Sequence, residues 1–435
     1  MTEPADLAAL APALRAAARR FGSPLYLTEA AGLSAAAAEL SAAFPDPWIR
    51  QYSVKANDVA PIVARLASAG LGANVVSRGE WAIARRAGLA NDQITLEGVG
   101  KTDADLRAAV RAAAKGEPLR WVAVESADEA ATLARLARRA GLSELDVLLR
   151  FNPAVEPETQ HALAVGAGTS KFGLADDELG AAIEAGGGAE GPLHWRGIHL
   201  HVGSQLGAVD AWRDAVRRAL AIVGLVSGGL PGFDTLDVGG GFPVATSGEA
   251  VPRPERFARE LPGLLEAVPA DRRPSRLAVE PGRFLVAGAG WLIGSVLHVR
   301  ERGGRMVVLD AGMTELIRPA LYSAHHRIVA LTSLGRPVES RPLETADVSP
   351  AIAGRPTGDE PAEVHGPICE STDALGRHDL PLLRRGDLVA IRDAGAYGAS
   401  FASTYNGRPR PPQVILEQDG RLTLARRRGS PAALG

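Results

Sequence analysis

Lys55 is the residue through which this chain could do covalent chemistry. It follows a β-type run that begins at Trp48 and ends at Val54, and Ala-Asn and a helix-like stretch come next. A lysine at the end of a buried strand has an apolar stem and an amine aimed into a pocket, where desolvation favours the neutral amine. A neutral amine can form a Schiff base with an aldehyde. The competing interpretation is a surface lysine that caps the strand, because most lysines are solvated.

Three later β-type runs also end in polar or glycine-rich segments, at 199–205, 237–242 and 280–283. The triple glycine Gly239-Gly240-Gly241 removes side chains, so backbone N–H groups can approach an anion, although a flexible turn is the other interpretation. Glu280 ends a buried strand and would be costly there without a partner. A ring nitrogen that must stay protonated would be such a partner, and so would Arg283.

Two histidines, His199 and His201, lie two positions apart at the end of one of these runs. On a regular strand they share one face, which would permit a two-histidine metal site. No carboxylate close in sequence completes such a site, so we expect no metal. The alternative is that one or both are packed, hydrogen-bonded histidines.

Polar clusters also occur in the last third of the chain, at 310–322, 366–373 and 393–408. Cys369 is the only cysteine, so no intrachain disulfide is possible. A lone cysteine is more often a buried small hydrophobe than a catalyst. The turn-like polar surroundings of Cys369, between Gly-Pro and Glu-Ser-Thr-Asp, favour a chemically available thiol.

Apolar runs that alternate with amphipathic helical patterns must position these residues. The runs cover 48–55, 72–77, 94–99, 121–126, 146–152, 195–202, 235–239 and 276–280. Such alternation predicts a parallel sheet. Eight units over about 250 residues match a (β/α)8 TIM-type barrel better than an open doubly wound sheet. Active sites of these barrels lie at the carboxyl ends of the strands, where the polar segments occur.

The alternation stops after residue 284, and strands without intervening helices follow. We therefore expect a barrel at 35–284 and a C-terminal β domain, sandwich or barrel-like, at 285–435. We expect the segment 1–34 to pack with the β domain. Ser34 is the candidate N-cap of a helix that runs to Phe44, and the Pro- and Gly-rich stretch 333–362 is predicted to be an exposed loop.

Composition excludes several classes of protein. The 435 residues include 48 basic and 50 acidic side chains, so no nucleic acid or other polyanion is expected as a partner. The N-terminus lacks the basic region of a signal peptide. The longest apolar stretch, Ala219 to Leu230, is too short to span a bilayer. We expect a cytoplasmic protein with no membrane partner.

Taken together, these motifs resemble the alanine-racemase-type (fold III) pyridoxal-phosphate decarboxylases, and most of all the diaminopimelate decarboxylases. The resemblance runs from about Pro24 to Pro412, with at least six motifs in the family's order. It implies a barrel with a C-terminal β domain, a homodimer with shared active sites, and conversion of meso-diaminopimelate to L-lysine and CO2.

The resemblance also implies a role for each motif residue. Lys55 would hold the cofactor as a Schiff base, His201 would stack on its ring, and Glu280 would pair with the ring nitrogen. The cofactor phosphate would be held by Ser204, Gly239, Gly240, Gly241, Gly282, Arg283 and Tyr397. The substrate would be bound by Arg283, Arg318, Tyr322, Glu370 and Ser371. Cys369 would donate the proton, and it would enter the site from the partner subunit together with Glu370.

Departures from the family's usual sequence leave the substrate open. Asn74 stands where the family usually has Asp, the segment Thr159-Gln160-His161 differs, and Val165 replaces a usual Thr. One alternative is a related decarboxylase that acts on another D-configured or carrier-bound amino acid. A second is a non-catalytic protein that carries the cofactor, which the β domain and Cys369 argue against. A racemase would need a tyrosine acid/base in a C-terminal motif that we do not find.

Overall fold

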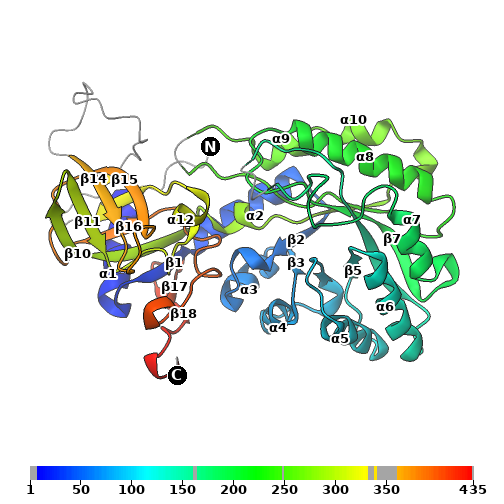
Figure 1. The fold of residues 1–435 in the computed structure, drawn as a ribbon, viewed down its shortest axis with the longest axis horizontal. Coiled ribbons are helices and arrows are strands. Elements are labelled where there is room, and N and C mark those ends of the chain that lie inside the picture. The colour runs from blue at the N-terminus through cyan, green and yellow to red at the C-terminus, as the bar shows by residue number, and fades with distance from the viewer. Residues whose placement is uncertain (1–6, 160–163, 247–248, 332–337, 340–359, 434–435) are drawn as a thin grey trace. The chain divides into compact units, whose positions relative to one another are not determined.

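The computed structural model describes residues 7–159, 164–246, 249–331, 338–339 and 360–433. The chain divides into two compact units. The barrel unit comprises Ser34–Val244 and Val251–Leu285, and the β unit comprises Met1–Leu33, Ala245–Ala250 and Val286–Gly435. Figure 1 shows the ribbon of both.

Eight parallel strands close the barrel in chain order, from β2 to β9. The pairs Ile49↔Ala278 and Arg50↔Val279 join the last strand to the first. The predicted (β/α)8 barrel is therefore confirmed. The strands are β2 Ile49–Ser53, β3 Gly72–Val75, β4 Ile94–Leu96, β5 Trp121–Val124, β6 Leu145–Phe151, β7 Leu193–Leu200, β8 Thr235–Asp237 and β9 Arg276–Val279.

Helices connect the barrel strands, and hydroxyl side chains fix where several of them begin. Thr102 accepts a hydrogen bond from the Asp105 N–H at the start of α5, and Ser126 accepts one from the Glu129 N–H at the start of α6. The helices are α2 Ala30–Ala43, α3 Ala60–Ser68, α4 Arg78–Arg86, α5 Asp103–Ala114, α6 Ala127–Arg139, α7 Leu179–Ala185, α8 Asp210–Val226, α9 Pro254–Ala258, α10 Leu261–Glu266 and α11 Arg283–Val286.

One sequence-based expectation about these elements is wrong: Ser34 is not an N-cap, because α2 begins before it, at Ala30. The amphipathic stretch 255–268 forms two short helices, since Pro262 in the first turn of α10 cannot donate a backbone hydrogen bond to α9. The first strand after the barrel begins only at Gly290, because the Leu285 N–H bonds to the Gly282 carbonyl in a helical turn.

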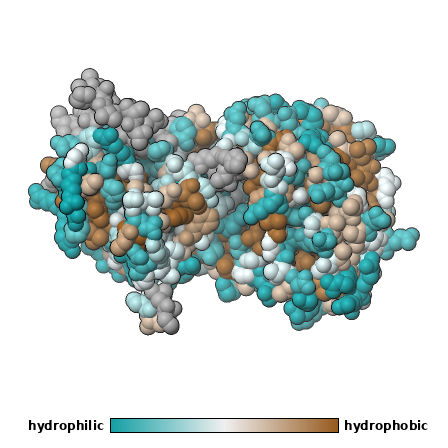
Figure 2. All heavy atoms as spheres, viewed as in Figure 1, coloured by the Kyte–Doolittle hydropathy of each residue, from teal (hydrophilic) through white to brown (hydrophobic). Residues whose placement is uncertain are grey.

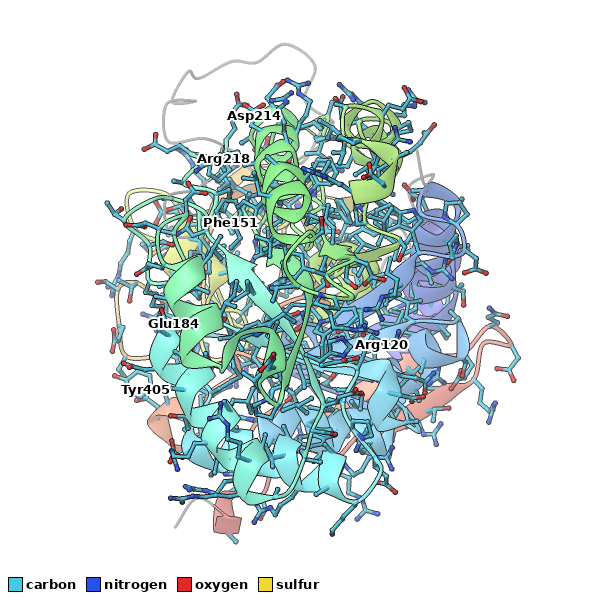
Figure 3. All side chains as sticks on the ribbon, turned by 90° about the vertical axis from the view of Figure 1, so that its right-hand side faces the viewer. Arg120, Phe151, Glu184, Asp214, Arg218 and Tyr405 are labelled. Atoms are coloured by element: carbon cyan, nitrogen blue, oxygen red, sulfur yellow. The ribbon has the colours of Figure 1, made fainter. Side chains whose placement is uncertain are left out.

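Aromatic side chains anchor the chain just after the triple glycine. Phe242 is fully buried, with its ring centroid 5.1 Å from that of Phe257 and 5.7 Å from that of Phe44. On another side of the barrel, the Arg218 guanidinium of α8 lies over the ring of Phe151, at the end of β6 (Figure 3). These contacts hold the carboxyl ends of two strands in place.

The β unit contains a sheet in the order β13-β12-β16-β10-β1-β17-β18, extended by β11, β14 and β15. Strand β1 (Leu25–Glu29) pairs antiparallel with β10 and parallel with β17, so residues from both ends of the chain share this sheet. The other strands are β10 Gly290–Glu301, β11 Arg305–Leu309, β12 Ile328–Leu331, β13 Val338–Glu339, β14 Glu360–His365, β15 Ala374–Leu380, β16 Leu388–Ile391, β17 Gln413–Leu416 and β18 Leu422–Arg426.

Two helices complete the β unit. Helix α1 (Leu7–Phe21) packs Leu10 and Leu14 against an apolar cluster that includes Trp291, and α12 (Arg318–Tyr322) follows β11. The loop predicted at 333–362 lies largely outside the described residues. Along the part of the chain that is described, no helix is long and apolar enough to cross a bilayer. Figure 2 shows one face of the molecule, with polar side chains over most of it.

Candidate active site

The triple glycine lies so close to neighbouring backbone that no side chain fits there. A Cβ on Gly239 would be 2.2 Å from the Leu200 carbonyl oxygen. On Gly240 it would be 2.3 Å from the Glu280 carbonyl oxygen, and on Gly241 it would be 2.3 Å from that of Gly203. Gly239 and Gly241 also have left-handed φ angles, which favour glycine. The loop is therefore packed closely against neighbouring backbone, and its approach to an anion stays a prediction.

Polar groups collect beside this loop. The Gly240 N–H donates to His201 Nδ1 at 3.3 Å. Arg283, which is buried, places Nε and Nη2 3.4 and 3.5 Å from Ser204 Oγ. A guanidinium next to a hydroxyl and glycine backbone is a set of donors suited to a phosphate group.

Lys55 lies just past β2, in a one-turn 3-10 helix, Val54–Ala56. The preceding Ser53 ties this turn to the end of β9: its N–H bonds to the Pro281 carbonyl at 3.1 Å and its Oγ to the Glu280 carbonyl at 3.0 Å. A Cβ on Gly282 would come within 3.0 Å of the Ser53 Cβ. Lys55 and the Glu280–Gly282 segment are therefore close neighbours at the strand ends.

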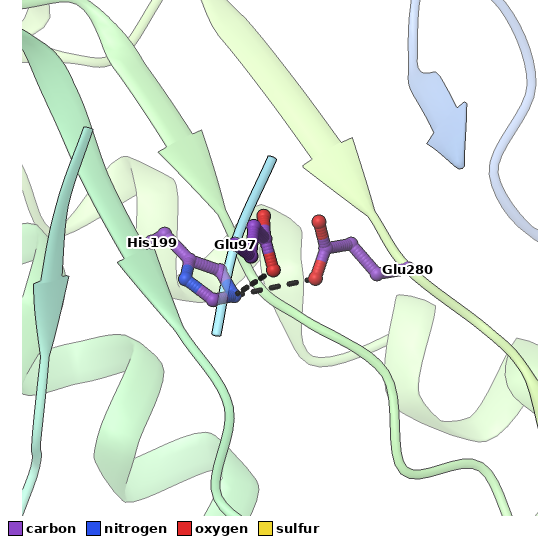
Figure 4. A group of neighbouring side chains, drawn as sticks. All are labelled: Glu97, His199 and Glu280. Carbon is purple, nitrogen blue, oxygen red and sulfur yellow. Dashed lines mark ion pairs between the residues drawn. The ribbon is translucent and has the colours of Figure 1, made fainter. Parts of the chain in front are cut away.

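A buried acid and histidine cluster lies inside the barrel at the ends of β4, β7 and β9 (Figure 4). His199 Nε2 is 3.3 Å from Glu97 Oε2 and 3.2 Å from Glu280 Oε2. All three residues are at most 5% exposed. The Asn74 amide donates to Glu97 Oε2 at 2.6 Å. Asp237, fully buried on β8, accepts from the Gly239 N–H at 2.9 Å.

Burial moves the pKa of several groups in this cluster. Burial, followed by the charge of Glu280, raises the pKa of Glu97 to about 8. The same two causes raise the pKa of Asp237 well above its ordinary value. Burial lowers the pKa of His199 to about 4, so this imidazole is neutral. Desolvation and then the charge of Lys55 lower the pKa of His201 well below its ordinary value.

An ion pair borders the cluster but does not neutralise it. Arg150 Nη1 is 2.7 Å from Glu125 Oε1, and both side chains are buried. Burial acts to raise the pKa of Glu125, but the charges of Arg150 and Lys101 and the hydrogen bonds from Arg150 and Gly173 outweigh it and lower this pKa. The charge of Arg150 is thus already paired with an ionised carboxylate.

Glu97, His199 and Glu280 each offer one ligand atom within 4.8 Å of the others. The folded chain therefore supplies the nearby carboxylates whose absence from the local sequence led us to expect no metal. The cluster nevertheless lacks the character of a cation site, because the Asn74 amide directs a positive N–H toward Glu97 Oε2. We interpret the three residues as a group that shares protons.

The remaining candidate residues belong to the β unit. Buried Arg318 places Nη1 2.7 Å from His326 Nε2, and Tyr322 ends the same helix, α12. Cys369 is an exposed free thiol. Glu370 and Ser371 are exposed beside it, and Glu370 accepts a hydrogen bond of 2.6 Å from the Tyr405 hydroxyl.

Tyr397, the last predicted ligand of the phosphate, has a left-handed φ of 57°. A non-glycine residue with this backbone conformation stores strain, and such residues concentrate at functional sites. Its ring centroid lies 5.6 Å from that of Phe401, which helps to fix the ring.

The barrel unit thus brings together Lys55, His201, Ser204, Gly239–Gly241, Glu280, Gly282 and Arg283. Sequence reasoning missed Glu97, Glu125 and Arg150. A signal was present for the two acids, since each directly follows a buried strand, β4 or β5. A carboxylate at that position is costly without a partner, as was argued for Glu280.

The chain is similar to known proteins over nearly its whole length. Residues 31–287 match the family model described as "Pyridoxal-dependent decarboxylase, pyridoxal binding domain". The chain is 34% identical to diaminopimelate decarboxylase of Aquifex aeolicus, over 95% of this chain and 91% of that protein. It is 35% identical to that of Deinococcus radiodurans, over 96% of each. A crystal structure of diaminopimelate decarboxylase from Helicobacter pylori, complexed with L-lysine, is 28% identical, with a TM-score of 0.82 and coverage of 97% of this chain and 98% of that one.

Proposed function

Because the chain belongs to the diaminopimelate decarboxylase family of pyridoxal-dependent decarboxylases, we propose that it converts meso-diaminopimelate to L-lysine and CO2. The chain is a carboxy-lyase that uses pyridoxal 5'-phosphate. The observation that carries the substrate assignment is the similarity, over nearly the whole chain, to proteins named diaminopimelate decarboxylase. The related Helicobacter pylori enzyme binds L-lysine, the product expected of this reaction.

The barrel residues fit the cofactor on three counts. The buried Oε1 of Glu280 has no hydrogen-bond partner among the described residues, which suits an acceptor for a protonated ring nitrogen. The glycine loop excludes side chains next to His201. Arg283 and Ser204 supply cationic and hydroxyl donors for a phosphate.

We assign the residues of the barrel unit to roles on this basis. Lys55 would hold the cofactor through Nζ, and His201 would pack on the face of its ring. Within the barrel unit, the phosphate would contact Ser204, Gly239–Gly241, Gly282 and Arg283. The resemblance also assigns Tyr397 to a phosphate. When bound, pyridoxal phosphate supplies an electron sink for the pair of electrons left by the departing CO2.

The proposed reaction depends on two protons, one kept on the cofactor ring nitrogen and one donated by Cys369. Glu280 would accept a hydrogen bond at its carboxylate and so would keep a proton on the ring nitrogen. The resemblance assigns Arg283, Arg318 and Tyr322 to substrate carboxylate, a group that the planar guanidinium matches. After the C–C bond to the carboxyl group breaks, the Cys369 thiol would deliver a proton to the carbon that lost CO2.

The proposal includes a homodimer in which Cys369, Glu370 and Ser371 complete the partner's site. Their exposure supports this assignment, because a residue that acts on a neighbouring subunit must be accessible. Large apolar side chains of the same unit are also exposed, Leu321 at 56% and Phe401 at 42%. Cys369 must stay a free thiol to act as an acid, so we also propose a cytoplasmic location, where thiols are kept reduced.

The experiment that tests this function is CO2 release by the purified protein with meso-diaminopimelate, D-lysine, D-ornithine and L-glutamate. We expect turnover of meso-diaminopimelate with L-lysine as product. Glu370→Gln should raise KM for this substrate, whereas Glu184→Gln removes an exposed carboxylate on α7 (Figure 3) and should leave KM unchanged. Preference for another amino acid in the panel would contradict the assignment.

A further inference from the structure

Glu97 is a buried acid that none of the roles above uses. It directly follows β4 and is 4% exposed. Oε2 accepts from the Asn74 amide at 2.6 Å and lies 3.3 Å from His199 Nε2, and Oε1 has no partner among the described residues. A buried ionised carboxylate with so few donors would be strongly disfavoured.

The groups that face Glu97 come from every neighbouring part of the barrel. Two are further acids, Glu280 beyond β9 and Asp237 on β8. His199 on β7 is neutral, and the charge of Arg150 on β6 is paired with Glu125, beyond β5. The charge of Lys55, beyond β2, reaches His199. The three acids Glu97, Asp237 and Glu280 therefore share one buried region with little opposing charge.

Like-charged carboxyl groups at such close range cannot all be ionised in a buried site. Oε2 of Glu97 and Oε2 of Glu280 both lie against His199 Nε2, at 3.3 and 3.2 Å, and burial, followed by the charge of Glu280, raises the pKa of Glu97 to about 8. Glu280 must be the anion if it is to stabilise a protonated ring nitrogen. The proton of the pair therefore resides on Glu97.

We propose that Glu97 is a positioning residue for the decarboxylation: its protonated carboxyl donates a hydrogen bond to Glu280 and holds that carboxylate, as an anion, toward the cofactor ring. This inference rests on the proposed function for its catalytic consequence. The location of the proton is a separate claim that can be tested without turnover.

Infrared spectroscopy of the full-length, cofactor-loaded protein tests the proton directly. We expect a protonated-carboxyl band at neutral pH that disappears with a midpoint near 8. The component of the band with this midpoint should be missing from Glu97→Gln, in which Asp237 can still contribute a band, and it should be retained in Glu184→Gln, the matched surface control. A band of equal size in Glu97→Gln and wild type would overturn the proposal, and so would a wild-type protein that lacks it.

The pH dependence of kcat separates a positioning role from a merely structural one. The amide of Glu97→Gln can still donate to Glu280 but cannot ionise. We expect its kcat at neutral pH to stay within about threefold of wild type, with KM unchanged and the alkaline fall near pH 8 removed. Glu97→Ala, which lacks the donor, should lose about tenfold in kcat at every pH, the effect of one hydrogen bond to a charged group.

An alkaline fall in Glu97→Gln that matches wild type would refute the positioning role. If no amino acid in the panel is decarboxylated, the proposed function fails, yet the infrared titration still decides where the proton lies. The two failures are therefore distinguishable.

Discussion

Replacing Glu97 by Gln should remove a pH-dependent loss of stability from the barrel unit. The pKa of Glu97 is raised from the ordinary 4.5 to about 8 by burial and by Glu280. Between these two values the unfolded chain has released a proton that the folded chain still holds. Folding then binds a proton, so the free energy of unfolding falls as the pH rises through this window.

The size of the effect follows from the width of the window. Each pKa unit corresponds to about 1.4 kcal/mol. Relative to Glu97→Gln, wild type should lose nothing below about pH 4.5 and about 3 kcal/mol by neutral pH. The loss should level off at about 5 kcal/mol above pH 8, where the folded protein has also released the proton.

Urea unfolding followed by tryptophan fluorescence is the suitable assay. Five of the six tryptophans lie in the barrel unit, at positions 48, 81, 121, 195 and 212, so the signal reports mainly on that unit. Measurements at several pH values and at one saturating cofactor concentration cancel the effect of the cofactor from the difference between variants. Glu184→Gln serves as the control and should follow wild type throughout.

The reasoning is refuted if the wild-type and Glu97→Gln curves run parallel. A difference in unfolding free energy that stays constant to within about 0.5 kcal/mol from pH 5 to pH 9 would mean that Glu97 is ionised in the folded protein. A difference that grows as the pH falls would mean that its pKa is lowered rather than raised.

Three further predictions concern the loop, the thiol and the ion pair. Gly240→Ala places a Cβ 2.3 Å from the Glu280 carbonyl oxygen, so cofactor affinity in an absorbance titration should fall at least about tenfold. Gly224→Ala on α8, where a Cβ meets nothing within 4 Å, should leave this affinity unchanged. Cys369→Ala should keep the absorbance of the bound cofactor and lose most turnover, and full activity would remove the thiol from the mechanism. Arg150→Met leaves the Glu125 carboxylate buried without its partner and should cost about 3–5 kcal/mol in urea unfolding. Adding Glu125→Gln should recover at least half of that cost, and no recovery would contradict the interpretation of a buried ion pair.

The parts of the site that the sequence could predict share one property. A short apolar run precedes each of Lys55, the Gly239–Gly241 loop and Glu280. Because all strands of such a barrel have their carboxyl ends at the same rim, these residues are expected to lie close together. The barrel can also be predicted from the sequence, because alternation of strand and helix patterns is a local signal. Each of its eight strands overlaps the run that predicted it.

Some strands of the β unit show the opposite case. Strand β15 contains Gly376, Arg377 and Asp379, and its buried side chains do not alternate regularly with exposed ones. Its sequence alone therefore does not predict a strand. Pairing with β14 produces it. Such strands depend on neighbours that are distant in the chain, and their sequences carry a weak intrinsic preference.

The buried acid cluster gives a structural reason for an amide at position 74. In sequence it is an amide at the end of β3 where the resemblance leads one to expect Asp. In the fold its side chain meets Glu97, on the neighbouring strand end, at 2.6 Å. An Asp at position 74 would face a fourth buried carboxyl group toward Glu97, Glu280 and Asp237, and one more proton would be needed to keep the region neutral. The amide donates instead, and it leaves Glu97 free to direct its own proton at Glu280. An amide at position 74 thus suits an acid at position 97, and only the closed barrel brings the two side chains together.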